Sequence, residues 1–365
     1  MRTLLILAAL TPFAHAAPPP PPDDLNPLLA PIRAKHNLPA LAAAVLKDGR
    51  ITSIGAVGTR HAAVADPVTV NDLWHLGSDT KAMTATLIAR LVERGRLSWD
   101  LTLEKAFPEI KLHPLYKGVT LEKLLTHTGG LPADVPEQLW SKLWERQGTN
   151  AEQRMTLVKG ILTAKPGTRT FRYSNAGYAI AGAIAERAEE RSWEELIKAE
   201  LFQPLGMKNV GFGAPGKDQP WGHQWVDKKA LPMAPGPQAD NPPGVAPAGA
   251  VHASLKDWAK FVLLHLNGAR GLKTILHPNT FRKLHTAPAG SGYAMGWMVV
   301  ERPWAGGRAL THAGSNTMWY AVAWLAPEKD FGILITTNLG DGPAARACDE
   351  TAAALIKQAQ NVGGL

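Results

Sequence analysis

The 365-residue sequence contains a single cysteine, Cys348, so no disulfide can form within the chain. Cys348 lies in a helical pattern of small and apolar residues near the C-terminus. A lone cysteine in such a pattern usually behaves as a small hydrophobic side chain. We therefore expect a buried, unreactive thiol.

The sequence also lacks the spacings that mark several common sites. Its 12 histidines show no metal-binding pattern such as His-Glu-x-x-His, so neither a metal nor another cofactor is predicted. No Gly-x-Ser-x-Gly turn is present, which argues against an α/β-hydrolase, and no phosphate-binding loop occurs. The net charge of +8 is spread along the chain, without basic runs that alternate with aromatic residues. Nucleic acid is therefore not an expected partner.

Residues 1–17 have the features of a secretory signal peptide: an early arginine, an apolar stretch from Leu4 to Leu10, and a small-x-small sequence at positions 14–16. The apolar stretch is too short to span a membrane. The prolines of residues 18–24 predict a stiff spacer, and one domain is expected over residues 25–365. We expect an exported protein, periplasmic or secreted.

Patterns typical of β-strands occur near both ends of the chain, and helical patterns fill the middle. Leu41–Leu46 and Arg50–Val57 are predicted strands joined by an Asp-Gly turn, and four more strand patterns follow after position 295. This order predicts an α+β fold with two lobes. One is an antiparallel sheet flanked by helices, built from residues of about 25–72 and 248–365; the other is an all-helical lobe of about 73–247.

A segment rich in proline and glycine interrupts the predicted helical lobe. It runs from Gly211 to Pro247 and contains Trp221 and Trp225. A loop of this length inside a domain is usually either functional or disordered. Its tryptophans favour a wall of a cleft.

The first candidate for chemistry is Ser78, which a loop delivers to the start of a helix that ends at Gly95. Residues three apart share a helix face, so Lys81 should stand beside Ser78. A serine hydroxyl needs a base to become a good nucleophile, and a desolvated lysine can be neutral enough to serve. The alternative interpretation is a helix cap followed by a surface lysine.

A second candidate is Tyr173 with Asn175, on a turn before another helical pattern. A phenol that loses its proton near cations can act as a base, and an asparagine side chain can hold an amide-like substrate. A core tyrosine followed by a helix-capping asparagine would give the same pattern.

The third candidate is His312-Ala313-Gly314-Ser315 at the end of a predicted strand. The small residues leave the strand edge open to a substrate, and the Ser315 N–H can complete an oxyanion hole with that of Ser78. A plain strand histidine is the alternative.

These three motifs, in this order, resemble those of the serine β-lactamase and penicillin-binding protein superfamily. The resemblance is strongest to the branch of class C β-lactamases, Streptomyces-type D-alanyl-D-alanine carboxypeptidases, D-aminopeptidases and β-lactamase-like esterases. It covers nearly the whole chain after Leu25. Four further stretches look like family signatures: Leu124–Pro132, Pro204–Met207, Pro247–Ala250 and Tyr293–Trp297.

The resemblance implies a two-lobed fold with the site between the lobes and no cofactor. Ser78 would be the acylated nucleophile, and Lys81 and Tyr173 would carry its proton to the leaving group and later activate water. Asn175 would hold the substrate amide or its equivalent. The substrate would be a small molecule or a peptide.

In the strand motif, the resemblance gives His312 the place where many relatives have lysine, supplying hydrogen bonding and positive potential. Gly314 would keep the strand edge open, and the N–H groups of Ser78 and Ser315 would bind the oxyanion. A histidine there should make activity sensitive to pH near neutrality. Ala313 replaces a hydroxyl residue that many relatives use to hold a substrate carboxylate, which argues against efficient turnover of β-lactams.

Two aspartates depart from or extend the pattern. Asp79 follows the nucleophile directly, and we expect it to cap the helix and point away from the site. Asp134 falls where class C relatives place a polar substrate contact, although a solvated loop aspartate fits equally well.

The sequence thus predicts an exported serine acyl hydrolase that acts on an amide, β-lactam or ester. The alternative is a binding protein of the same fold that holds penicillins or cell-wall peptides without turning them over. The retention of Lys81, Tyr173 and Asn175 favours the enzyme.

Overall fold

The computed structural model describes residues 20–365 except positions 63, 362 and 364, so the predicted signal peptide lies outside the described residues. The strands are β1 (Asp23–Asp24), β2 (Ala40–Lys47), β3 (Arg50–Gly58), β4 (Leu73–His75), β5 (Val210–Phe212), β6 (Gly222–Val226), β7 (Lys229–Met233), β8 (Val251–Ser254), β9 (Met298–Arg302), β10 (Gly307–Ser315), β11 (Tyr320–Ala326) and β12 (Phe331–Thr337).

Most of the helices lie in one run between β4 and β5. The helices are α1 (Asn26–Lys35), α2 (Thr80–Glu93), α3 (Leu103–Ala106), α4 (Leu121–Leu125), α5 (Glu137–Trp144), α6 (Asn150–Leu162), α7 (Asn175–Glu189), α8 (Trp193–Ile197), α9 (Ala246–Gly249), α10 (Leu255–Ala269), α11 (Pro278–Leu284) and α12 (Ala344–Asn361). A π-helical turn, Lys198–Phe202, continues α8.

The main sheet is built from both ends of the chain, as the sequence predicted. Its strand order is β1-β3-β2-β12-β11-β10-β9, and every pairing is antiparallel except that of the two-residue β1 with β3. The N-terminal and C-terminal parts join where β2 pairs with β12, with Leu41 opposite Thr337. The hairpin of β2 and β3 turns at Asp48 and Gly49, which both have positive φ, as an Asp-Gly turn requires.

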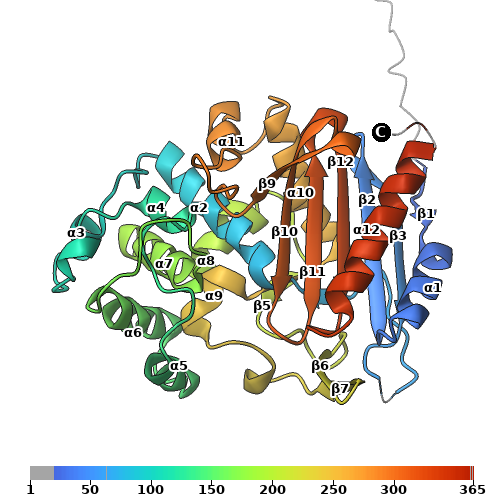
Figure 1. The fold of residues 1–365 in the computed structure, drawn as a ribbon, viewed down its shortest axis with the longest axis horizontal. Helices are drawn as coiled ribbons and strands as arrows, with labels where there is room; N and C mark the ends of the chain where they lie inside the picture. Colours follow the sequence, from blue (N-terminus) through green and yellow to red (C-terminus); the bar gives the residue numbers. More distant parts are fainter. Residues whose placement is uncertain (1–19, 63, 362, 364) are drawn as a thin grey trace, which may run out of the picture.

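Both faces of the sheet are buried against a hydrophobic core. Alternate residues of each strand point to opposite sides, so each strand contributes to both cores. Leu41 and Val45 of β2 join a core with residues of α1 and α12, whereas Ala42 and Ala44 join the larger core that includes α10 and the helical part. Figure 1 shows α1 and α12 on one side of the sheet, and α10 and the remaining helices on the other. The predicted α+β fold class is confirmed.

The helical part is packed around α2 and α7, which contact each other and α9. Both central helices are buried along most of their length, which matches their small and apolar residues. A buried arginine, Arg154 of α6, donates hydrogen bonds to Glu186 of α7 and to Glu194 of α8. It also donates to the carbonyl of Pro243, so three helices and the segment before α9 are tied together.

Segment 211–247, expected to be a loop, contains a β-hairpin instead. Strands β6 and β7 pair antiparallel, and Asp227 and Lys228 form their turn with φ values of 49° and 60°. Left-handed conformations at two successive residues usually need Asn-Gly or Asp-Gly, so this turn gave no sequence signal. The small sheet β4-β8-β5 also borders the helical part, and its strands of three or four residues are too short for a clear alternation.

Candidate active site

Ser78 lies in a 3-10 turn, Gly77–Asp79, that leads directly into α2. The turn packs against the end of β10, and glycine is needed at both contact points. Gly77 has a φ of 50°. A Cβ on Gly314 would lie 2.5 Å from the backbone nitrogen of Ser78, and it would also meet the carbonyl oxygen of Leu76. The strand edge therefore lies directly against the serine turn.

Lys81 is completely buried beneath Ser78. Its Nζ lies 2.9 Å from Ser78 Oγ, 2.8 Å from Asn175 Oδ1 and 2.7 Å from the carbonyl oxygen of Ala248. Burial lowers the pKa of Lys81 well below its ordinary value of 10.5, and the nearby Asp79 opposes this effect.

A neutral amine in this position has one productive arrangement. It has two N–H donors and one lone pair, and two of its three neighbours, Asn175 Oδ1 and the Ala248 carbonyl, can only accept. The lone pair is then left for the hydroxyl of Ser78, which can donate to it. The geometry fits a base that is ready to take the serine proton.

Tyr173 reaches the same serine from the loop before α7. Lys81 Nζ lies 4.7 Å from the centre of its ring, and its hydroxyl lies near enough to Ser78 for the serine to lower its pKa. Burial raises the pKa of Tyr173 above its ordinary value, and the influence of Ser78 only partly offsets this. The phenol is therefore protonated near neutral pH. The sequence-based expectation of a tyrosinate base is not supported, and a proton donor fits better.

His127 holds this tyrosine loop in place, although it was not among the predicted site residues. Its Nδ1 accepts a hydrogen bond from the N–H of Ser174 at 3.1 Å, and its carbonyl accepts one from the N–H of Arg172 at 2.9 Å. Burial and the nearby Lys81 lower the pKa of His127 to about 2, so the ring stays neutral and Nδ1 can accept. Its sequence signals were its place within a family signature stretch and a His-Thr-Gly run that fits the same loose pattern as His312-Ala313-Gly314.

His312 lies close to Tyr173, with 6.1 Å between ring centres, but it does not line the pocket described below. Its Nδ1 lies 2.8 Å from the carbonyl oxygen of Ala313, and its Nε2 lies 3.1 Å from the hydroxyl of Tyr293. Burial lowers the pKa of His312 to about 3. The expected positive potential and sensitivity near neutral pH are therefore wrong, because desolvation keeps the ring uncharged.

Asp79 is buried and does not cap α2, contrary to the prediction. Neither of its carboxylate oxygens has a hydrogen-bond partner among the described residues. Burial raises the pKa of Asp79 well above its ordinary value, and the charge of Lys81 opposes the rise. The side chain is buried where β10 and β11 pack against the turn.

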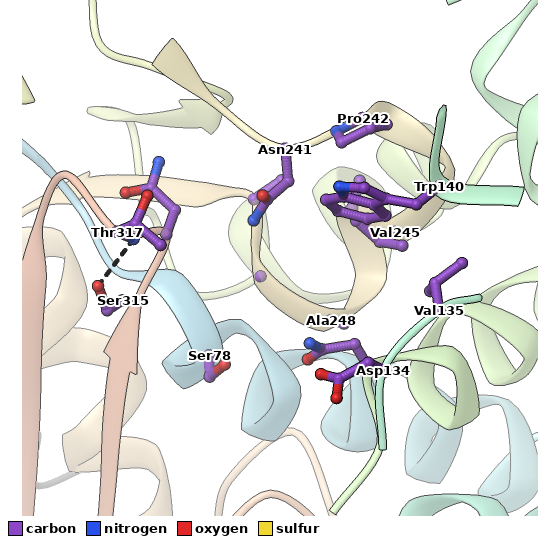
Figure 2. A pocket seen from close by; sticks show the side chains of 15 residues that line it. Ser78, Asp134, Val135, Trp140, Asn241, Pro242, Val245, Ala248, Ser315 and Thr317 are labelled. Atoms are coloured by element: carbon purple, nitrogen blue, oxygen red, sulfur yellow. Dashed lines mark hydrogen bonds between the residues drawn. The ribbon is translucent and has the colours of Figure 1, made fainter. Parts of the chain in front are cut away.

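A pocket of about 360 Å³ opens at Ser78, within the size range of small-molecule sites. Four predicted site residues line it: Ser78, Asn175, Ser315 and Asp134. The remaining lining residues are Val135, Trp140, Asn241, Pro242, Val245, Ala246, Ala248, Gly249, Ala250, Asn316 and Thr317. Figure 2 shows Ser78 between Ser315 on one side and Asp134 on the other.

The expected tryptophan wall is only partly correct. Trp221 stacks on His61, with 4.6 Å between ring centres, and Trp225 packs beside the sheet core; neither lines the pocket. The end of the same segment, at Asn241 and Pro242, does contribute to the wall. The tryptophan in the pocket is Trp140 of α5, which an ordinary amphipathic helix pattern did not distinguish from a core residue.

Cys348 is buried, as expected, and burial raises the pKa of its thiol. Within the described part of the chain, no cluster of three or more histidine, cysteine, aspartate or glutamate side chains is placed to bind a metal. None of the helices in that part is both long and apolar enough to cross a membrane.

The fold and this Ser-Lys-Tyr arrangement define a protein of the β-lactamase and penicillin-binding type, with a serine-hydrolase-type site. The Beta-lactamase family model matches residues 25–358, and the chain belongs to that family.

Relatives agree with this assignment. The chain is 28% identical over 307 residues to a protein named Beta-lactamase from Escherichia coli K12, covering 82% of this chain and 76% of the relative. It is 24% identical to penicillin-binding protein 4 of Amycolatopsis lactamdurans, over 90% of this chain and 86% of the relative. Among solved structures, an octameric penicillin-binding protein homologue from Pyrococcus abyssi superimposes with a TM-score of 0.74 at 27% identity, covering 91% of this chain and 77% of that one.

Proposed function

We propose that this protein hydrolyses ester or amide substrates through an acyl-enzyme on Ser78, with β-lactams as poor substrates. One observation carries the proposal. The amine of Lys81 is buried 2.9 Å from Ser78 Oγ, while two carbonyl groups occupy its other directions. A neutral amine held this way can serve as the base that the serine needs.

The first half of the reaction attaches the acyl group to the enzyme. Ser78 Oγ bonds to the substrate carbonyl carbon while its proton passes to Lys81 Nζ. The negative charge on the carbonyl oxygen is stabilised by the N–H groups of Ser78 and Ser315, which flank the pocket. The carbon–leaving-group bond then breaks, and the leaving group takes the phenolic proton of Tyr173. Lys81 returns a proton to Tyr173.

The second half releases the acyl group. A water molecule gives its proton to the neutral amine of Lys81 as its oxygen bonds to the acyl carbon. The ester bond to Ser78 breaks, Ser78 Oγ recovers the proton, and a carboxylic acid leaves. Asn175 lines the pocket and also accepts from Lys81, so it can orient both the substrate and the amine.

Poor β-lactam turnover is expected because Ala313 offers no hydroxyl to a substrate carboxylate. His312 does not compensate, since it is buried, uncharged near neutral pH and outside the pocket lining.

The proposal is tested by assaying p-nitrophenyl butyrate, nitrocefin and D-amino-acid peptides in parallel. We expect a burst of p-nitrophenolate with the ester, followed by steady turnover, and slow turnover of nitrocefin. Ser78→Ala should abolish the burst, and Ser98→Ala, at an exposed site, should not. One stoichiometric burst without turnover would instead indicate a binding protein of the same fold. Fast nitrocefin hydrolysis would contradict the inference that Ala313 makes β-lactam turnover poor.

Export is a separate proposal that rests on the sequence of residues 1–17. Mass measurement of the mature protein from its native host tests it, because cleavage should remove that segment.

A further inference from the structure

We propose that the pocket at Ser78 selects acyl groups that end in a positively charged ammonium group, with Asp134 as the counter-ion. The inference rests on the proposed acyl transfer to Ser78 and names the class of substrate for that site.

Asp134 has the position and freedom that a counter-ion needs. It lies on the loop between α4 and α5 and lines the same pocket as Ser78. In Figure 2 its carboxylate lies across the pocket from Ser315 and Thr317, with Ser78 between the two sides. The side chain is exposed and makes no hydrogen bond or ion pair with the other described residues. Its carboxylate is thus available to a ligand.

No cation in the wall competes for this carboxylate. Among the described residues that line the pocket, Asp134 is the only charged side chain, and the others are amide, hydroxyl or apolar. Arg146 lies in a neighbouring cavity, where it donates to backbone carbonyl oxygens of Pro237, Asp240 and Asn241. Lys81 is buried below Ser78 with a lowered pKa. The pocket is therefore locally negative in a protein whose net charge is +8.

An aromatic side chain shares the pocket with Asp134. Trp140 is half-buried and lines the pocket, and its ring packs edge-to-face against Trp144 with 6.2 Å between centres. A cation is attracted to the face of an indole ring, and methylated ammonium groups are bound in this way by aromatic cages. Val135 and Val245 add apolar surface beside it. A carboxylate, an indole and aliphatic groups together suit an alkylated ammonium better than a carboxylate or a neutral polar group.

The charged group belongs on the acyl side of the substrate. After the first chemical step the leaving group departs, and the acyl group stays bonded to Ser78, which opens into this pocket. The pocket volume of about 360 Å³ accommodates an acyl chain of several carbons with a branched end.

The test compares two p-nitrophenyl esters of the same shape. One carries γ-trimethylammonio-butyrate, which is permanently charged, and the other carries its neutral isostere with a tert-butyl group. We expect kcat/KM to favour the charged ester roughly two- to fivefold at low ionic strength, the effect of one solvent-exposed carboxylate at close range. The preference should shrink as salt is added, since exposed charges are screened.

Two variants assign the preference to a residue. Asp134→Asn should bring the ratio of the two kcat/KM values close to one and remove its salt dependence. Glu137→Gln removes a nearby exposed carboxylate that does not line the pocket, and it should leave the ratio unchanged. An unchanged ratio in Asp134→Asn, or a wild-type preference for the neutral ester, would overturn the inference.

A binding measurement separates this inference from the proposed reaction. The p-nitroanilides of the same two acids are titrated into Ser78→Ala protein by calorimetry, so turnover plays no part. Tighter binding of the charged anilide, lost when Asp134→Asn is added, supports the ammonium site even if the wild-type protein hydrolyses neither ester. Equal binding of the two anilides overturns the inference even if both esters are hydrolysed.

Discussion

Gly314→Ala is the substitution that most sharply tests how β10 and the serine turn form the site. An added Cβ would lie 2.5 Å from the nitrogen of Ser78, whereas ordinary Cβ contacts begin at 3.4 Å. The obstacles are backbone atoms, including the carbonyl oxygen of Leu76, so no side chain can rotate away. Relieving the contact with the Ser78 nitrogen alone needs about 0.9 Å, and the Leu76 oxygen is closer still, so strand and turn must separate by more than this.

That separation widens the distance between the N–H groups of Ser78 and Ser315. A displacement of about 1 Å in an active site can cost roughly 100-fold in rate, and loss of one oxyanion donor costs roughly 100- to 1,000-fold. We expect kcat for p-nitrophenyl butyrate to fall about 100-fold. The free energy of unfolding should fall by about 1–3 kcal/mol, as is typical of overpacking.

The assay is stopped-flow ester hydrolysis, normalised to the folded fraction measured by urea unfolding. Gly118→Ala is the matched control, because nothing lies within 4 Å of its added Cβ. A folded Gly314→Ala protein whose kcat stays within about threefold of wild type would refute the assignment of Ser315 to the oxyanion site.

Three further predictions concern charge in the interior. Asp79→Asn should move the acidic limb of the kcat/KM profile to lower pH, because Asp79 raises the pKa of Lys81; an unmoved limb would mean that Asp79 carries no charge there. Arg154→Met should lower the free energy of unfolding in urea by about 3–5 kcal/mol, since it leaves two carboxylates without their buried partner. Arg187→Met, which removes an exposed ion pair with Glu109, should lower the free energy of unfolding by less than about 1 kcal/mol. Equal losses of stability in the two variants would contradict this argument. The free energy of unfolding should also fall as the pH drops below about 6.5, because three buried histidines stay neutral in the folded protein but take up protons in the unfolded chain. Near pH 5 each of these histidines should lower the free energy of unfolding by on the order of 2 kcal/mol. Thermal unfolding across pH checks this, and a flat profile would contradict it; the histidines are His127, His265 and His312, with pKa values lowered to about 2, 3 and 3.

The sequence predicted the architecture well because its signals were local and regular. The short β-type runs of β2 and β3, and the Asp-Gly turn between them, are visible in the chain itself. The helix after Ser78 follows from its apolar period and from Gly95, which has the positive φ of a helix end. The hairpin at Asp227 escaped prediction because its turn uses residues that rarely adopt left-handed conformations.

The site was predictable in its members but not in its charge states. Ser78, Lys81 and Tyr173 were identified from short motifs, and the fold brings them together. Whether Tyr173 is ionised or His312 is charged depends on burial by segments distant in sequence, which no motif encodes. For the same reason the support that His127 gives to the tyrosine loop was not apparent before its contact with Ser174 was seen.

The claim on which the account depends is that Lys81 is an uncharged amine beside Ser78 near neutral pH. The most direct measurement is a ¹³C NMR titration of lysine Cε carbons, with the Lys81 signal assigned by its loss in Lys81→Met. The account predicts that this signal titrates well below the ordinary lysine pKa of 10.5, and that the acidic limb of the burst rate follows the same transition. A Lys81 signal that titrates with the surface lysines would contradict it.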